Sequence, residues 1–71
     1  MPAYRPQDVL KKLKKIGFYI DHQTGSHIVL YDESKMKRVT LPSHKKDLKI
    51  KTFHSILNQA QITLDQYLQI K

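Results

Sequence analysis

The spacing of apolar residues changes from a helical period to a strand period near residue 18, and it returns to a helical period near residue 50. Between residues 6 and 16 the apolar side chains recur at helical spacing, at Val9, Leu10, Leu13 and Ile16. Pro6 suits the first turn of a helix and Gly17 suits its left-handed end. The spacing therefore predicts an amphipathic helix over residues 6–16.

From Phe18 onward apolar and polar residues alternate, which is the period of a β-strand. The first strand begins at Phe18 and leads into a tight turn at Thr24-Gly25. Residues 26–31 and 37–41 form the second and third strands, and Pro42 is expected to end the third. Because short turns join the three strands, they are predicted to form an antiparallel meander.

Helical spacing returns after a basic loop, at Ile50, Phe53, Ile56, Leu57 and Ala60. Thr63 and Gln66 then have the spacing of a capping box, which predicts a short terminal helix. The order α-β-β-β-α indicates an α+β, two-layer fold with a three-stranded antiparallel sheet and both helices on one face. Double-stranded RNA-binding domains have this order of elements, although topology alone is weak evidence of function.

Alternation along the strands assigns each residue to one face of the sheet. The inner face is expected to carry Phe18, Ile20, Ile28, Leu30, Val39 and Leu41. The open face is expected to carry Tyr19, Asp21, His27, Val29, Tyr31, Arg38 and Thr40. By the same alternation His22 shares the inner face with Ile20, as a partly buried structural histidine at the edge.

The length of 71 residues accommodates one domain, 1–71, and the sequence contains no cysteine for disulfides or thiolate metal sites. The polar start of the chain, residues 1–7, lacks the apolar core of a secretory signal. No apolar run is long enough to span a bilayer. We therefore expect a cytoplasmic protein without a membrane partner.

Basic residues outnumber acidic ones by thirteen to six, which gives a formal net charge of +7. This excess points to a polyanionic partner, with nucleic acid first and an acidic protein second. Lys11, Lys12, Lys14 and Lys15 are expected to form a solvated helix face. Lys45, Lys46, Lys49 and Lys51 are better placed for phosphate, because they lie in a loop and at a helix start with free amides.

Histidine is the residue best suited to proton transfer in this chain, because its unperturbed pKa of about 6.5 lies near neutral pH. RNA carries its own nucleophile, the 2′-hydroxyl, so a base and a few cations can cleave it without metal. Spacing alone treats His27 as an exposed strand residue and His54 as a helix-surface residue. His44 begins the basic loop, where phosphate contact and simple solvation are equally compatible with the sequence.

The four histidines lie on different predicted elements and lack the spacing of metal ligands. There is also no glycine-rich phosphate loop and no pair of carboxylates at helical spacing. The sequence therefore predicts neither a metal site nor a cofactor.

Four segments, at residues 10–18, 25–29, 38–44 and 46–60, occur in an order along the chain that resembles the HicA family of mRNA interferase toxins. Residues 25–29 (GSHIV) resemble its GSH strand, and residues 38–44 (RVTLPSH) resemble its R-V-T-[VL]-P-x-H strand end. Residues 46–60 resemble its K-E-L-K…T…S-I-L-K-Q-A segment, and residues 10–18 are similar to its first helix and G-F boundary. Each segment is short, but together they cover nearly the whole chain.

This resemblance implies a fold like that of double-stranded RNA-binding domains and a toxin that cleaves mRNA as a metal-independent endoribonuclease. It implies that His27, in the GSH motif, is catalytic, and that a cognate HicB antitoxin binds the toxin and blocks this histidine. The residues expected to contact RNA are Gly25, Ser26, Arg38, His44, Lys45, Lys46, Lys49 and Lys51.

Two positions depart from the family's pattern. Lys51 stands where a glycine usually precedes the threonine of the second helix, and His54 stands where an arginine is common. Both positions belong to the entry and the basic surface of that helix. They alter the phosphate contacts that the resemblance implies there, and they leave the GSH motif intact.

Two other functions are compatible with this fold and charge. A non-catalytic RNA-binding module would bind RNA without turnover, and the loss of His27 would have little effect on it. A protein-interaction domain with a basic face for an acidic partner would bind RNA negligibly, even at low salt. Salt dependence separates these alternatives, because phosphate contacts weaken steeply as salt rises.

Overall fold

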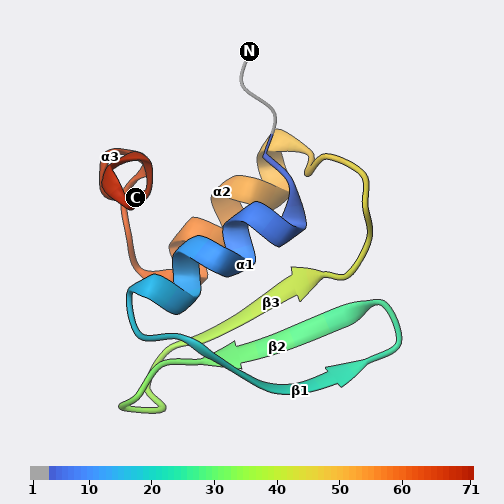
Figure 1. Cartoon of the computed structure of the whole chain (residues 1–71), viewed down its shortest axis with the longest axis horizontal. Coiled ribbons are helices and arrows are strands. Elements are labelled where there is room, and N and C mark those ends of the chain that lie inside the picture. Colours follow the sequence, from blue (N-terminus) through green and yellow to red (C-terminus); the bar gives the residue numbers. More distant parts are fainter. Residues whose placement is uncertain (1–3) are drawn as a thin grey trace.

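The computed structural model describes residues 4–71 and begins with a helix where the sequence predicts one (Figure 1). This helix, α1, spans Pro6–Lys15, one residue short of its predicted end. Gly17 ends it with φ at +103° and donates its amide to the Lys14 carbonyl at 3.2 Å. The sequence predicts that residues 1–7 do not form a secretory signal. Residues 1–3 of this segment lie outside the described residues.

Three strands form one antiparallel sheet in the order β1-β2-β3, and they confirm the predicted meander. They are β1 (Tyr19–Thr24), β2 (His27–Tyr31) and β3 (Arg38–Pro42). The turn between β1 and β2 consists of Gly25-Ser26, one residue later than predicted. Gly25 supplies the left-handed conformation that this two-residue turn requires, with φ at +53°.

Pro42 lies inside β3, whereas the sequence predicts that it follows the strand. It pairs with His27, and in the next pair Ser43 donates its amide to the Ser26 carbonyl at 2.6 Å. Hydrogen-bonded and non-hydrogen-bonded pairs alternate in an antiparallel ladder. The nitrogen of Pro42 therefore faces away from β2, and the ladder loses no hydrogen bond to the proline.

Strand β1 contains a bulge at Asp21 that the sequence does not reveal. Ile20 pairs with Leu30, but the next pair joins His22 to Val29, so that Asp21 is skipped in the register. A bulge of this kind moves every following side chain to the other face. His22 therefore lies on the open face beside Val29, and its predicted place on the inner face is wrong.

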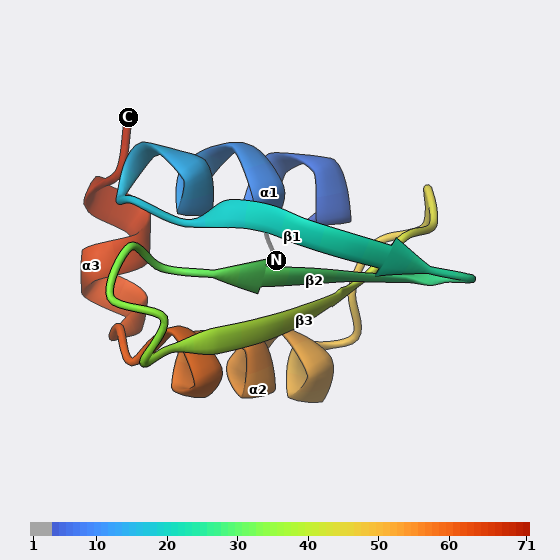
Figure 2. The same ribbon diagram turned by 90° about the horizontal axis from the view of Figure 1, so that it is seen from below.

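The remaining helices are α2 (Ile50–Ala60), with the predicted bounds, and α3 (Leu64–Gln69). Thr63 and Gln66 form the predicted capping box, in which each side chain accepts the other's amide, at 3.1 and 2.8 Å. Figures 1 and 2 show α1 and α2 on one face of the sheet and α3 near the end where β2 finishes. None of the helices within residues 4–71 is long and apolar enough to cross a membrane.

The hydrophobic core lies between the sheet and the helices and confirms most of the predicted inner face. Its largest fully enclosed side chains are Val9, Leu13, Leu30, Val39, Leu41, Phe53 and Ile56. Ile28 is only partly buried, and Ile20 is 40 % exposed because it lies on the edge strand β1. The core is therefore centred on β2 and β3, and β1 contributes little to it.

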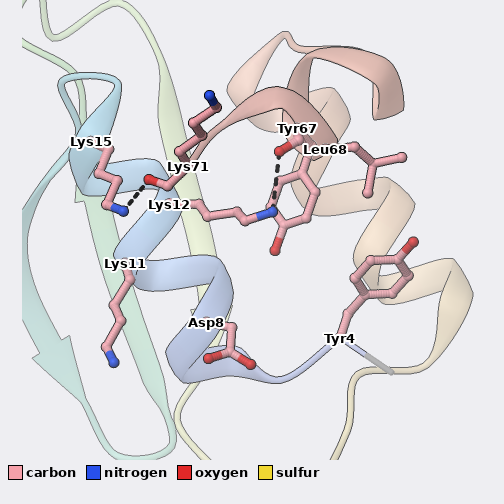
Figure 3. Close-up of a pocket in the computed structure, with 8 residues that line it drawn as sticks. All are labelled: Tyr4, Asp8, Lys11, Lys12, Lys15, Tyr67, Leu68 and Lys71. Carbon is pink, nitrogen blue, oxygen red and sulfur yellow. Dashed lines mark hydrogen bonds between the residues drawn. The ribbon is translucent and has the colours of Figure 1, made fainter. Parts of the chain in front are cut away.

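Lys12, one of the four α1 lysines that were predicted to be solvated, is partly buried and contacts α3 (Figure 3). Lys12 Nζ donates to the Tyr67 carbonyl oxygen at 3.4 Å and lies 4.3 Å from the centroid of the Tyr67 ring. Lys15 Nζ donates to the main-chain oxygen of Lys71. Positive charge near the C-terminal end of a helix is favourable, so Lys12 helps to fix α3 beside a groove of about 340 Å³.

The free edge of β3 is covered by a side chain from α2. The Thr40 amide points away from β2 and donates to Gln59 Oε1 at 2.8 Å. Gln59 Nε2 in turn donates to Ser55 Oγ at 3.2 Å, which holds the amide group in this orientation. A helix side chain thus satisfies a strand amide that would otherwise need water or another strand.

Candidate active site and nucleic-acid interface

The open face of the sheet presents three rows of paired side chains. According to the register, the rows are Thr24, His27 and Pro42; His22, Val29 and Thr40; and Tyr19, Tyr31 and Arg38. In the part of the chain that the structure describes, no helix covers this face (Figure 2). Side chains on this face are therefore accessible to a large partner.

His27 occupies the first position of β2 and is exposed on this open face, as predicted. Ser26 Oγ lies 3.5 Å from His27 Nδ1, which is too long to fix the ring strongly. Gly25, Ser26 and His27 share one corner of the sheet, beside the main-chain link from Ser43 to Ser26. This corner gives the imidazole a fixed backbone position and leaves its ring accessible.

Val29 is only 3 % exposed although it lies on the open face and outside the main core. It is the central residue of the central strand, with His22 and Thr40 as its direct partners. His27 and Tyr31 lie two residues away on the same strand and flank it on the same face. Val29 is thus a buried apolar residue at the centre of the open face, between His22, His27 and Tyr31.

The bulge brings His22 and Asp21 into the candidate site, which sequence reasoning did not anticipate. His22 Nδ1 lies 2.7 Å from Asp21 Oδ2, and both side chains are nearly half exposed. His22 is the direct partner of Val29, and His27 is two residues before Val29. Because β1 has no glycine or proline at the bulge, no local sequence signal indicated that this histidine belongs with His27.

Arg38 lies on the open face but at the opposite end from His27. It pairs with Tyr31, whereas His27 pairs with Pro42, four residues further along β3. At the usual rise of a strand, these two positions are about 13 Å apart. Arg38 therefore lies at one end of the open face, and His27, the predicted catalytic histidine, lies at the other end.

The basic loop, residues 43–49, leaves β3 beside the start of β2 and rises to the helix layer (Figure 1). Leu48 is buried and donates its amide to the Tyr4 carbonyl at 2.7 Å. Arg5 Nε lies 3.5 Å from Asp47 Oδ1, in an exposed ion pair. These contacts position the loop while Lys45, Lys46 and Lys49 remain exposed.

The start of α2 offers free amides among these lysines. Lys49 is the N-cap residue, its side chain makes no capping hydrogen bond, and the first turn carries no acidic residue. Lys51, in the same turn, is exposed. Unpaired amides and the helix dipole both favour an anion at such a terminus.

His44 is exposed and lies toward the helix side of the sheet rather than the open face. It lines a hollow of about 270 Å³ together with Lys45, Pro6, Leu10 and the inner-face residue Ile28. Of the other predicted positions, His54 lies exposed on α2. The structure thus gathers Gly25, Ser26 and His27 at one corner, with His44 and the lysines at the adjacent loop and Arg38 apart.

Within residues 4–71, no three histidine or carboxylate side chains converge as a group that could hold a metal ion. The exposed cations and the two histidines instead resemble an arrangement for binding phosphate and moving protons.

Comparison with known proteins identifies the family. A family model described as the HicA toxin of bacterial toxin–antitoxin matches residues 6–62, which is most of the 71-residue chain. The match runs from the first residue of α1 to just beyond α2, and α3 follows it. No curated protein matches the chain. The chain belongs to the HicA toxin family.

Proposed function

We propose that this toxin is an endoribonuclease that cleaves mRNA without a metal ion, with His27 as a general acid or base. The observation that carries the proposal is the position of His27, exposed at the corner of an uncovered sheet face. The chain leaves β3 at this same corner to form the basic loop. The HicA family match over residues 6–62 supports the same function.

The proposed chemistry needs one imidazole at the reacting phosphate and cations around it. His27 would exchange a proton with the 2′-hydroxyl of the RNA or with the leaving 5′-oxygen. The 2′-oxygen then bonds to phosphorus as the bond to the 5′-oxygen breaks. Positive groups that stabilise the crowded phosphate lower the barrier of this step.

We assign the phosphate contacts to the loop and to the entry of α2. Lys45, Lys46, Lys49 and Lys51 surround the open N-terminus of α2, and this combination of amides and cations suits phosphate oxygens. Gly25 and Ser26 would contact the nucleotides next to His27, and His44 would contact RNA at the adjacent loop. Arg38, at about 13 Å from His27 along the strand, would hold a phosphate further along the RNA.

A toxin of a toxin–antitoxin family has an antitoxin as its partner. We propose that this antitoxin is a HicB-like protein that covers His27 and competes with RNA for the open face. The net charge of +7 suits an acidic surface on that partner. We place both encounters in the cytoplasm, where mRNA is available.

The test is the cleavage of a long single-stranded RNA by the purified protein in EDTA, with a single-stranded DNA of the same sequence as a control. We expect the RNA alone to be cleaved and His27→Ala to abolish cleavage. Gln69→Ala is the control, because Gln69 is also exposed but lies on α3, away from the start of β2 (Figure 1). Salt-sensitive RNA binding without cleavage would instead identify a non-catalytic RNA-binding module.

A further inference from the structure

We propose that His22 is the second proton-transfer group of the reaction and that Asp21 positions it. This inference rests on the proposed function, because it concerns the same cleavage step. His27 alone can serve only one of the two oxygens that exchange protons. The structure offers one other histidine on the open face within residues 4–71, and the bulge at Asp21 places it there.

The register brings the two histidines close together. His22 is directly opposite Val29, and His27 precedes Val29 by two positions on β2, so the two histidines are diagonal neighbours. Diagonal neighbours on one face of an antiparallel pair are about 7–8 Å apart. A phosphate that lies over the sheet can therefore meet one imidazole on each side.

Asp21 holds the His22 ring in a useful orientation. The contact of 2.7 Å between His22 Nδ1 and Asp21 Oδ2 engages one ring nitrogen. The other nitrogen, Nε2, is then the one that exchanges a proton with RNA, and the carboxylate fixes the tautomer for this exchange. Because both side chains are nearly half exposed, their pairing adds little to stability.

The step balances with two histidines and no other reactant. One imidazole takes the proton of the 2′-hydroxyl while the 2′-oxygen bonds to phosphorus. The bond between phosphorus and the 5′-oxygen breaks, and the other imidazole, which starts protonated, gives its proton to that oxygen. The products are a 2′,3′-cyclic phosphate and a 5′-hydroxyl.

Few other ionisable groups share this surface with His22. Asp21 and Tyr19 come from its own strand, His27 and Tyr31 come from β2, and Arg38 lies at the far end of β3. Within residues 4–71 no helix lies over this face (Figure 2). A change in the pH profile on replacing His22 can therefore be attributed to this pair of histidines.

The experiment compares wild-type protein, His22→Gln, Asp21→Asn and the control Gln69→Ala, an exposed position on α3, in cleavage of a short RNA, with kcat and KM measured across pH. We expect His22→Gln to lower kcat about 10²–10⁴-fold with little change in KM. The bell-shaped profile of the wild type should lose one of its two limbs in this variant. Asp21→Asn should show a smaller loss and keep both limbs, and Gln69→Ala should behave like the wild type.

A wild-type protein that cleaves RNA, fails with His27→Ala and yet keeps both pH limbs in His22→Gln would overturn the inference. The proposed function would survive this result. A raised KM with unchanged kcat in His22→Gln would also overturn it, because His22 would then only bind RNA. A wild-type protein without cleavage would instead defeat the proposed function itself.

Discussion

The amide of Ser43 donates to the carbonyl oxygen of Ser26 at 2.6 Å and ties the start of the basic loop to the residue before His27. This link extends the β2–β3 ladder by one pair beyond Pro42. A main-chain hydrogen bond therefore joins the strand that carries His27 to the start of the basic loop. Their relative position depends on the main chain rather than on a flexible side chain.

The first prediction concerns this link. Ser43→Pro removes the amide donor and is expected to cost about 1 kcal/mol of stability and to lower RNA cleavage, although His27 is unchanged. Ser43→Ala keeps the amide and should stay near wild type in both respects. Thermal denaturation and cleavage assays check the pair, and equal behaviour of the two variants would show that the link has no role.

His27→Ala is expected to leave the fold intact. The side chain is exposed and its contact with Ser26 is long, so the free energy of unfolding should change by no more than about 0.5 kcal/mol. Leu30→Ala, on the same strand but fully buried, should cost about 2–5 kcal/mol. Urea denaturation measures both, and a large loss in the histidine variant would make its role structural.

Glycine is predicted to be required at position 25 because of the backbone conformation there. Room for a side chain is not the limiting factor. A Cβ at this position would meet no atom within 4 Å, but φ is +53°. Gly25→Val should therefore cost about 1–2 kcal/mol, while Gly25→Asn should cost less, because asparagine tolerates this conformation. Similar melting temperatures for the two variants would contradict this explanation.

Removing the capping box of α3 is expected to lower the stability of the protein without changing its activity. Thr63→Ala removes the acceptor of the Gln66 amide and should cost about 1 kcal/mol. RNA cleavage by the folded protein should not change, because α3 lies at the end of the sheet away from the start of β2 (Figure 1). Denaturation curves and cleavage rates measured on the same preparation check both statements.

Asp32 predicts a dependence of stability on pH. A hydrogen bond from Ser34, and then one from the Lys37 amide, lower the pKa of this carboxyl below its usual value of 3.8. The unfolded chain therefore binds a proton more readily, and the stabilisation is present above pH 3.8 and is lost as pH falls through the lower, folded-state pKa. Melting temperatures between neutral pH and this range should fall less in Asp32→Asn than in the wild type.

Local chemistry explains why much of the fold could be predicted. Gly17 marks the end of α1, and the Thr63 and Gln66 pair marks the start of α3, because each acts within its own turn. The bulge at Asp21 is different, because it depends on the pairing of β1 with β2. No residue type at this position indicates a bulge in the sequence. The prediction for His22 failed for this reason. Because of the error, sequence reasoning did not place His22 on the same face as His27.

Pairing between distant segments also explains the other differences. Pro42 belongs to β3 because its nitrogen faces the outside of the sheet, which the sequence cannot specify. Lys12 leaves the solvated face of α1 because α3 folds back over it. His27 was placed on the correct face by alternation, but its assignment as catalytic came from the resemblance of its motif and remains a prediction.

The side chain of Gln59 at Thr40 also affects how copies of this protein meet each other. An unprotected strand edge invites pairing with the edge of another molecule. Here a helix side chain blocks one edge of the sheet at its middle, and the bulge at Asp21 distorts the other. Neither border is a good template for a foreign strand, so two folded copies that meet have no free edge at which their sheets can pair readily.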